Sequence, residues 1–159
     1  KLLVVPVGGP FDLIIMRNRF ATISEVADVT VDGEVSKVLL RGIDRVRLLA
    51  RKGLQEAYFR RLEADVRERP EKAVDELRKK SQELIFLINV DESDRLIHLL
   101  NFLADLSQLA DFISNYFVVD FRKRLRLYRE PDVNARASML VALLDELISK
   151  MKRKNSVEQ

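Results

Sequence analysis

The stretch from Leu106 to Arg136, LSQLADFISNYFVVDFRKRLRLYREPDVNAR, decides the fold of this chain. Its first part carries apolar residues at spacings of three and four, which place their side chains on one face of a helix. That face consists of Leu109, Ala110, Phe112, Ile113, Tyr116 and Phe117. Ser107 stands just ahead of it and is the predicted N-cap. The pattern therefore predicts a short amphipathic helix with a well-packed face.

Two further helices follow with very short connections. Val118 and Val119 interrupt the first apolar pattern, and Asp120 is placed to cap a second, basic helix. Pro131 and Asp132 separate that helix from a third one, whose apolar stripe is wide enough to face a core. The stripe comprises Val133, Ala137, Leu140, Val141, Leu144, Leu147, Ile148 and Met151. Because the connections are so short, the three helices must pack against one another.

The N-terminal part of the chain has the alternating pattern of short β-strands. An Asp32-Gly33 pair between two such runs is a strong hairpin signal, and Gly42 suggests a bend or bulge in the returning strand. The predicted strands are Lys1–Val7, Leu13–Met16, Phe20–Val31, Val35–Arg41, Arg45–Arg51 and Tyr58–Val66. Strands of this length and spacing predict a small, strongly bent antiparallel sheet or barrel.

The apolar period changes from two to 3.6 at the charged run Arg67–Lys72. Pro70 suits the first turn of a helix that continues to Ile88. The chain is therefore predicted to be α+β, with a β-rich lobe over residues 1–68 and a helical bundle over residues 69–159 that ends in a long helix.

A loop over Asn89–Asp94 precedes another predicted helix, Leu96–Leu106. Ser93 or Asp94 is its expected N-cap. This helix is apolar nearly all round, which predicts a central place in the bundle.

Composition narrows the class of protein. Of the 159 residues, 47% are hydrophobic and 33% are charged, and no apolar run approaches the length of about 20 residues that a membrane span needs. The chain has no cysteine, which excludes disulfides and thiolate metal sites and suits a reducing compartment. No secretory signal follows Lys1, and we expect a cytoplasmic piece of a longer chain that makes no contact with a membrane.

The residues that commonly carry chemistry are sparse. The single histidine, His98, lies in an apolar helical pattern without a readable nucleophile or orienting partner, and we expect a structural role for it. Asp91, Glu92 and Asp94 lack the spacing of a calcium loop, and Gly8-Gly9 lacks the Lys-Ser/Thr of a phosphate-binding loop. The sequence predicts no catalytic residue, metal site or cofactor site in these 159 residues.

Two clusters of cations could bind phosphate groups. One comprises Arg122, Lys123, Arg124, Arg126 and Arg129, and the other Lys150, Lys152, Arg153 and Lys154. A solvated helix face and the preference of cations for helix C-termini explain both clusters more simply. With a net charge of only +3, binding of nucleic acid is possible but not favoured.

Aromatic side chains gather at the predicted helix ends and turns, at Tyr116, Phe117, Phe121 and Tyr128. We expect most of them to pack in the core. Any that stay exposed would form an apolar patch able to hold unfolded polypeptide. Tyr116, Phe117 and Phe121 are therefore the candidate substrate-binding residues.

The central stretch resembles the N-terminal domain of Lon-type ATP-dependent proteases. Leu109-Ala110-Asp111-Phe112-Ile113 is similar to the LAD-x-I pattern of that family, and Asp132-Val133 with Arg136 is similar to D-V-x-x-R at the same separation. Weaker similarities lie in Ala21–Val26 and Gly42–Leu48. Arg124-Leu125 stands where the family has a basic residue and glutamine, so no role of that glutamine transfers.

The resemblance implies a PUA-like barrel followed by helices, and a proline-rich strand before the equivalent of Lys1. It implies a non-catalytic domain that recognises unfolded or tagged proteins and supports assembly of a hexamer. An AAA+ module binding ATP and Mg²⁺, and a serine endopeptidase module, would lie elsewhere in the parent chain. The alternative is a free-standing PUA-like module that binds RNA or a small ligand.

Overall fold

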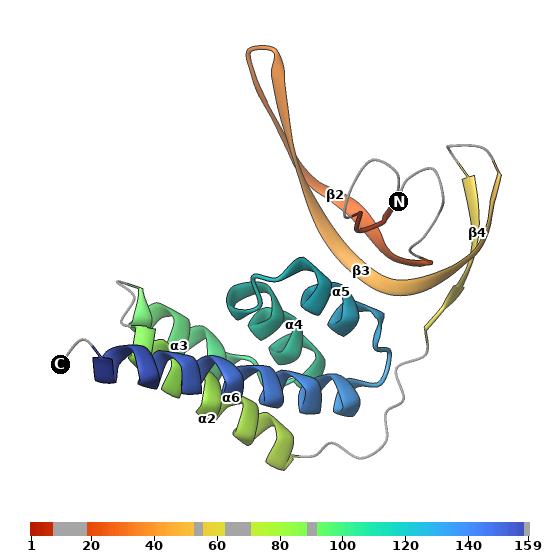
Figure 1. The fold of residues 1–159 in the computed structure, drawn as a ribbon. Helices are drawn as coiled ribbons and strands as arrows, with labels where there is room; N and C mark the ends of the chain where they lie inside the picture. The colour runs from red at the N-terminus through yellow and green to blue at the C-terminus, as the bar shows by residue number, and fades with distance from the viewer. Residues whose placement is uncertain (8–18, 53–55, 63–70, 89–91, 158–159) are drawn as a thin grey trace. The chain divides into compact units, whose positions relative to one another are not determined.

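The computed structural model describes residues 1–7, 19–52, 56–62, 71–88 and 92–157. The chain forms two compact units, residues 1–63 and 64–159 (Figure 1). The boundary predicted after residue 68 lies within residues 63–70, and the predicted strand Leu13–Met16 lies within residues 8–18. Both segments are outside the described residues. The α+β class is confirmed, since strands form the first unit and helices the second.

The first unit is a four-stranded antiparallel sheet with the strands in chain order. The strands are β1 (Leu2–Val4), β2 (Phe20–Asp32), β3 (Val35–Lys52) and β4 (Glu56–Arg61). The predicted hairpin between β2 and β3 is confirmed. Gly33 and Glu34 form its two-residue loop, and Gly33 has a φ of 61°, which glycine adopts without strain.

Bulges bend this sheet. Ile23 pairs with Asp44 and Ser24 with Gly42, so Ile43 is an extra residue on β3, beside the predicted bend at Gly42. The two strands predicted over residues 35–41 and 45–51 are one continuous strand, because the bulge bends β3 without ending it. The sheet core consists of Ala21, Ile23, Val46 and Leu48.

The described residues of the second unit form a bundle of five helices. They are α2 (Glu71–Ile88), α3 (Ser93–Phe102), α4 (Leu106–Phe117), α5 (Phe121–Arg129) and α6 (Val133–Val157). The long helix α6 contacts α2, α4 and α5. Leu77, Ile85, Leu100, Leu109, Ile113, Leu127, Leu140 and Leu144 are the largest fully buried apolar side chains of the bundle.

The predictions for two helices of this bundle were wrong in part. The N-cap of α4 is Asp105, whose carboxylate accepts the Gln108 N–H at 2.9 Å, and Ser107 lies in the first turn. Helix α3 begins after Glu92 without a side-chain cap and ends at Phe102, because Asp105 starts the next helix. Only Leu96 and Leu100 of α3 are buried, and Phe102 is 80% exposed, so α3 is peripheral.

Candidate functional site

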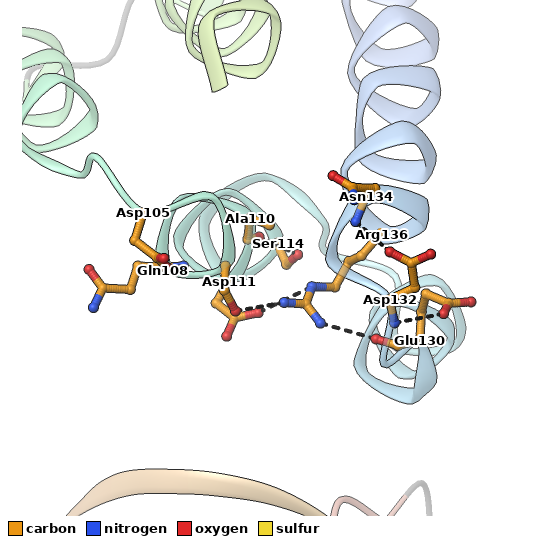
Figure 2. A network of polar contacts seen from close by, with 10 residues as sticks. Asp105, Gln108, Ala110, Asp111, Ser114, Glu130, Asp132, Asn134 and Arg136 are labelled. Atoms are coloured by element: carbon orange, nitrogen blue, oxygen red, sulfur yellow. Dashed lines mark hydrogen bonds and ion pairs between the residues drawn. The ribbon is translucent and has the colours of Figure 1, made fainter. Parts of the chain in front are cut away.

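The most deeply buried charged side chain of the described residues is Arg136 on α6, which is 3% exposed. Its Nη1 donates to the Glu130 carbonyl at 3.0 Å, and its Nη2 donates to Ser107 Oγ at 2.8 Å. Its Nε lies 3.6 Å from Asp111 Oδ1 (Figure 2). This single guanidinium therefore joins α4, the residue after α5 and the first turn of α6. We call these four residues the Arg136 clamp.

Carboxylates complete the turns around the clamp. Asp132 Oδ1 accepts the N–H of Asn134 at 2.8 Å and caps α6, and Glu130 Oε1 accepts the Asp132 N–H at 3.0 Å (Figure 2). Asp120 accepts the Lys123 N–H at 2.8 Å, which confirms its predicted role as the cap of α5. These bonds satisfy N–H groups that a helix start leaves without partners.

The contacts of the Arg136 clamp hold helices together and do not form a catalytic arrangement. A guanidinium stays protonated at all ordinary pH values, so it cannot act as a general base. Ser107 Oγ accepts a hydrogen bond from this guanidinium at 2.8 Å, a contact that orders the first turn of α4. Asp111, Asp132 and Arg136, which carry the family resemblance, therefore have a structural role.

The predicted binding residues separate into two environments. Phe117 is 8% exposed and belongs to the bundle core, so its side chain supports the surface from below. Tyr116 is 48% exposed, and its ring lies 4.6 Å from the ring of Phe112. Phe121, in the first turn of α5, is 38% exposed. Tyr116 and Phe121 thus remain available for contact.

Sequence reasoning missed Val119, which it treated only as an interruption of the pattern. Val119 lies between α4 and α5 and is 85% exposed, the highest exposed fraction among the large apolar residues described. The sequence could have indicated this exposure, because Val119 directly precedes the Asp120 cap and therefore lies in the connection between two helices, where side chains are commonly exposed. We call Phe112, Tyr116, Val119 and Phe121 the α4–α5 patch.

A second apolar surface lies on the hairpin of β2 and β3. Seven of its large aliphatic side chains are 38–69% exposed. Five of them share one face of the hairpin, namely Val26, Val29, Val31, Val38 and Leu40, and Val35 and Leu39 lie on the other face. An apolar surface of this extent is typical of a site that contacts another molecule. The alternating pattern predicted the two strands of this hairpin.

The bent sheet also has a groove, lined by apolar residues such as Leu3, Ile23 and Leu48 with a few charged ones. Two of the charged residues are bound to neighbours. Arg61 lies 3.5 Å from Asp44, and Glu56 lies 3.4 Å from Lys52. Ion pairs with neighbouring strand residues therefore hold the charges of Arg61 and Glu56.

Acidic neighbours engage several members of the two cation clusters. Glu146 accepts hydrogen bonds from Lys150 at 2.7 Å and Lys123 at 2.9 Å, and these two lysines lower its pKa to about 2. Lys152 lies 2.7 Å from Glu83 of α2. On the same helix pair, the hydrogen bond to Asp145 raises the pKa of Lys80. These contacts join α5 and α2 to α6.

His98 is exposed on α3. Across the described ranges, no three His, Asp or Glu side chains come together as metal ligands would. In the part of the chain that the structure covers, none of the helices combines the length and apolarity needed to cross a bilayer.

Comparison with known proteins agrees with this geometry. A family model described as the ATP-dependent protease La (LON) substrate-binding domain matches residues 15–146. The N-terminal domain of the Lon protease of the Mycobacterium avium complex has a similar structure, with a TM-score of 0.62 and 20% sequence identity. That match covers 80% of this chain and 70% of the other. No curated protein sequence matches the chain.

Proposed function

Because this chain belongs to the family of the ATP-dependent protease La (Lon) substrate-binding domains, we propose that it captures unfolded proteins on exposed apolar side chains and carries out no reaction itself. The observation that carries this proposal is the α4–α5 patch. Three large apolar side chains, Tyr116, Val119 and Phe121, are exposed within six consecutive residues.

The construction of the patch suits such a role. Tyr116 rests on Phe112, and the Asp120 cap fixes the start of α5 beside it. The Arg136 clamp holds the first turn of α4 and the residue after α5. Tyrosine and phenylalanine offer a large contact area with few rotatable bonds, so they lose little conformational entropy on binding. A rigid base with apolar rings on top can hold many different unfolded segments, since none of its contacts requires one particular sequence.

A binding titration with labelled, unfolded casein tests the proposal. We expect the double substitution Tyr116→Ala/Phe121→Ala to weaken binding by about tenfold or more, since each exposed aromatic contact is worth on the order of 1 kcal/mol. Val119→Ser should weaken binding further in that background. Phe86→Ala is the matched control, because Phe86 is an aromatic residue of the same unit that is 68% exposed and belongs to α2 rather than to α4 or α5.

The outcome is readable because none of these side chains is buried. If the Tyr116→Ala/Phe121→Ala protein keeps the unfolding midpoint and binds casein as tightly as the unmodified chain, the α4–α5 patch is not the capture surface. If the unmodified chain does not bind casein at all, the proposed function itself is wrong.

Family membership also supports a proposal for the parent chain. We expect it to be a cytoplasmic serine endopeptidase that uses ATP and Mg²⁺ in an AAA+ module, and that assembles as a hexamer with help from this domain. Sequencing beyond Gln159 should then show a phosphate-binding loop with the Gly-Lys-Ser/Thr pattern. A parent chain without this loop would contradict that assignment. Mass measurement of the intact parent chain would test the hexamer.

A further inference from the structure

The β2–β3 hairpin continues well past its neighbours in the sheet. Strand β1 pairs with β2 only at Thr22, Ile23 and Ser24, and β4 pairs with β3 only from Val46 onward. Beyond these points the two strands pair with each other alone among the described residues. Figure 1 shows the hairpin as a two-stranded ribbon that extends away from β1 and β4. Within the ranges that the structure describes, no strand pairs with the outer edge of β2 from Glu25 to Asp32.

The two faces of this ribbon differ. On one face the cross-strand pairs are Val26 with Leu40, Val29 with Val38, and Val31 with Ser36. On the other face they are Asp28 with Leu39, Thr30 with Lys37, and Asp32 with Val35. Ala27 is an extra residue on β2 between Val26 and Asp28. Because of this bulge, Val26, Val29 and Val31 share one face of β2, and Asp28, Thr30 and Asp32 share the other. Along the edge of β2, the side chains thus alternate between acidic or polar residues and valine.

The charges argue against a second copy of the chain as the partner at this edge. Pairing β2 with β2 of another copy would bring Asp28 and Asp32 close to Asp32 and Asp28 of that copy. Like charges on neighbouring strands are destabilising. A strand with cations at these positions would instead gain two favourable pairs. Its other face should be apolar, to extend the valine face of the ribbon.

We propose that the edge of β2 from Asp28 to Asp32 binds an extended segment of an unfolded protein that carries Lys or Arg on one side and aliphatic residues on the other. The segment adds as a further strand, so backbone hydrogen bonds hold it and alternating side chains select it. Its pattern is basic, apolar, any, apolar, basic, over about 17 Å of strand. This inference rests on the proposed function and names a preferred class of substrate.

Three labelled peptides test the inference against the whole chain. Each carries five test residues in the middle of an otherwise neutral sequence. The first peptide has Lys-Val-Thr-Val-Lys, and the second has Glu-Val-Thr-Val-Glu. The third has the residues of the first in the order Lys-Lys-Thr-Val-Val. We expect the first peptide to bind about tenfold more tightly than the second, since two attractive pairs replace two repulsive ones. It should also bind more tightly than the third, which has the same composition.

Variants of the chain separate this edge from general charge attraction. Asp28→Asn/Asp32→Asn should reduce the preference for the lysine peptide over the glutamate peptide to about twofold. The control Glu92→Gln/Asp94→Asn makes the same change in charge on exposed residues of the other unit, and it should leave the preference unchanged. Successive backbone N–H groups of a strand point to opposite edges, so the lysine peptide can be methylated on the nitrogens of one edge or of the other. Only one of these two methylated peptides should lose binding, because strand addition uses one edge of the peptide.

Equal binding of the lysine and glutamate peptides overturns the proposal, and so does unchanged binding of both methylated sets. Neither result touches the capture of casein by the α4–α5 patch, since that test uses other residues. If the unmodified chain fails to bind casein but keeps its preference for the lysine peptide, the proposed capture of unfolded proteins is refuted and the edge of β2 remains as a peptide-binding site.

Discussion

Replacing Arg136 by methionine should destabilise the helical bundle more than any other single change of a charged residue in it. Methionine keeps much of the apolar stem but removes the guanidinium. The Glu130 carbonyl and Ser107 Oγ then lose the donors that lie at 3.0 and 2.8 Å. Both contacts are partly buried, so water cannot replace them fully.

The magnitude follows from these contacts. A hydrogen bond from a charged donor contributes about 1.5–3 kcal/mol, and partial access of water to the two acceptors favours the lower end. Asp111 is half exposed, so its ion pair with Arg136 adds less than about 1 kcal/mol. The sum predicts a loss of about 3–4 kcal/mol in the free energy of unfolding.

Urea unfolding followed by far-ultraviolet circular dichroism measures this loss, because the helices dominate that signal. Arg153→Met is the matched control, as Arg153 is exposed on the same helix and donates to the Ser149 carbonyl within it. We expect the control to stay within about 0.5 kcal/mol of the unmodified chain. Arg136→Lys should recover only part of the loss, because an ammonium lacks the fork of donors that reaches separate acceptors. If Arg136→Met unfolds at the same urea concentration as Arg153→Met, the clamp does not stabilise the bundle.

Three further predictions concern the core, an ion-pair network and the hairpin. Leu140→Ala should cost about 2–5 kcal/mol in urea unfolding because Leu140 is fully buried, whereas Phe102→Ala, at an exposed site, should cost little. Glu146→Gln should lower stability at neutral pH. The pKa of Glu146 in the folded chain is about 2, below its ordinary value of 4.5. The difference in stability between the variant and the unmodified chain should therefore be fully present above pH 4.5 and vanish as the pH falls to about 2. A difference that stays constant down to that pH would contradict the role of Lys123 and Lys150. Gly33→Ala should destabilise the hairpin by about 1 kcal/mol, visible as faster amide exchange at Val31 and Val35, whereas Gly33→Asn should have a smaller effect; equal exchange in both variants would refute the need for a positive φ.

Local sequence signals predicted the start of a helix best where only one residue nearby could act as its N-cap. Asp120 stands alone before a basic helix, and the structure confirms it as the cap. Before α4, two residues with capping side chains lie close together, and Asp105 rather than Ser107 takes the role. The hydroxyl of Ser107 instead accepts from Arg136, a contact 29 residues away that no local pattern reveals.

Long-range packing also explains the misplaced helix α3. Its apolar residues predicted a central position, but the structure buries Leu96 and Leu100 and leaves Phe102 exposed. Burial of an apolar residue depends on which helices become its neighbours, and sequence periodicity does not contain that information.

The same limit applies to the binding surfaces. Sequence placed Tyr116, Phe117 and Phe121 together, and only the packing of α4 on α6 shows that Phe117 faces the core. On β2, the sequence predicted the strand but not that its outer edge beyond Ser24 would pair with no other described strand. That edge exists because β1 is short, which is a property of pairing between distant strands.

The most direct test of the account compares one protein in its folded and unfolded forms. Binding of the whole chain to native α-lactalbumin and to reduced, permanently unfolded α-lactalbumin can be measured by fluorescence anisotropy under one set of conditions. A domain that captures exposed apolar segments should bind the unfolded form and show no measurable binding to the native one. Equal affinity for both forms, or binding to neither, would contradict the account.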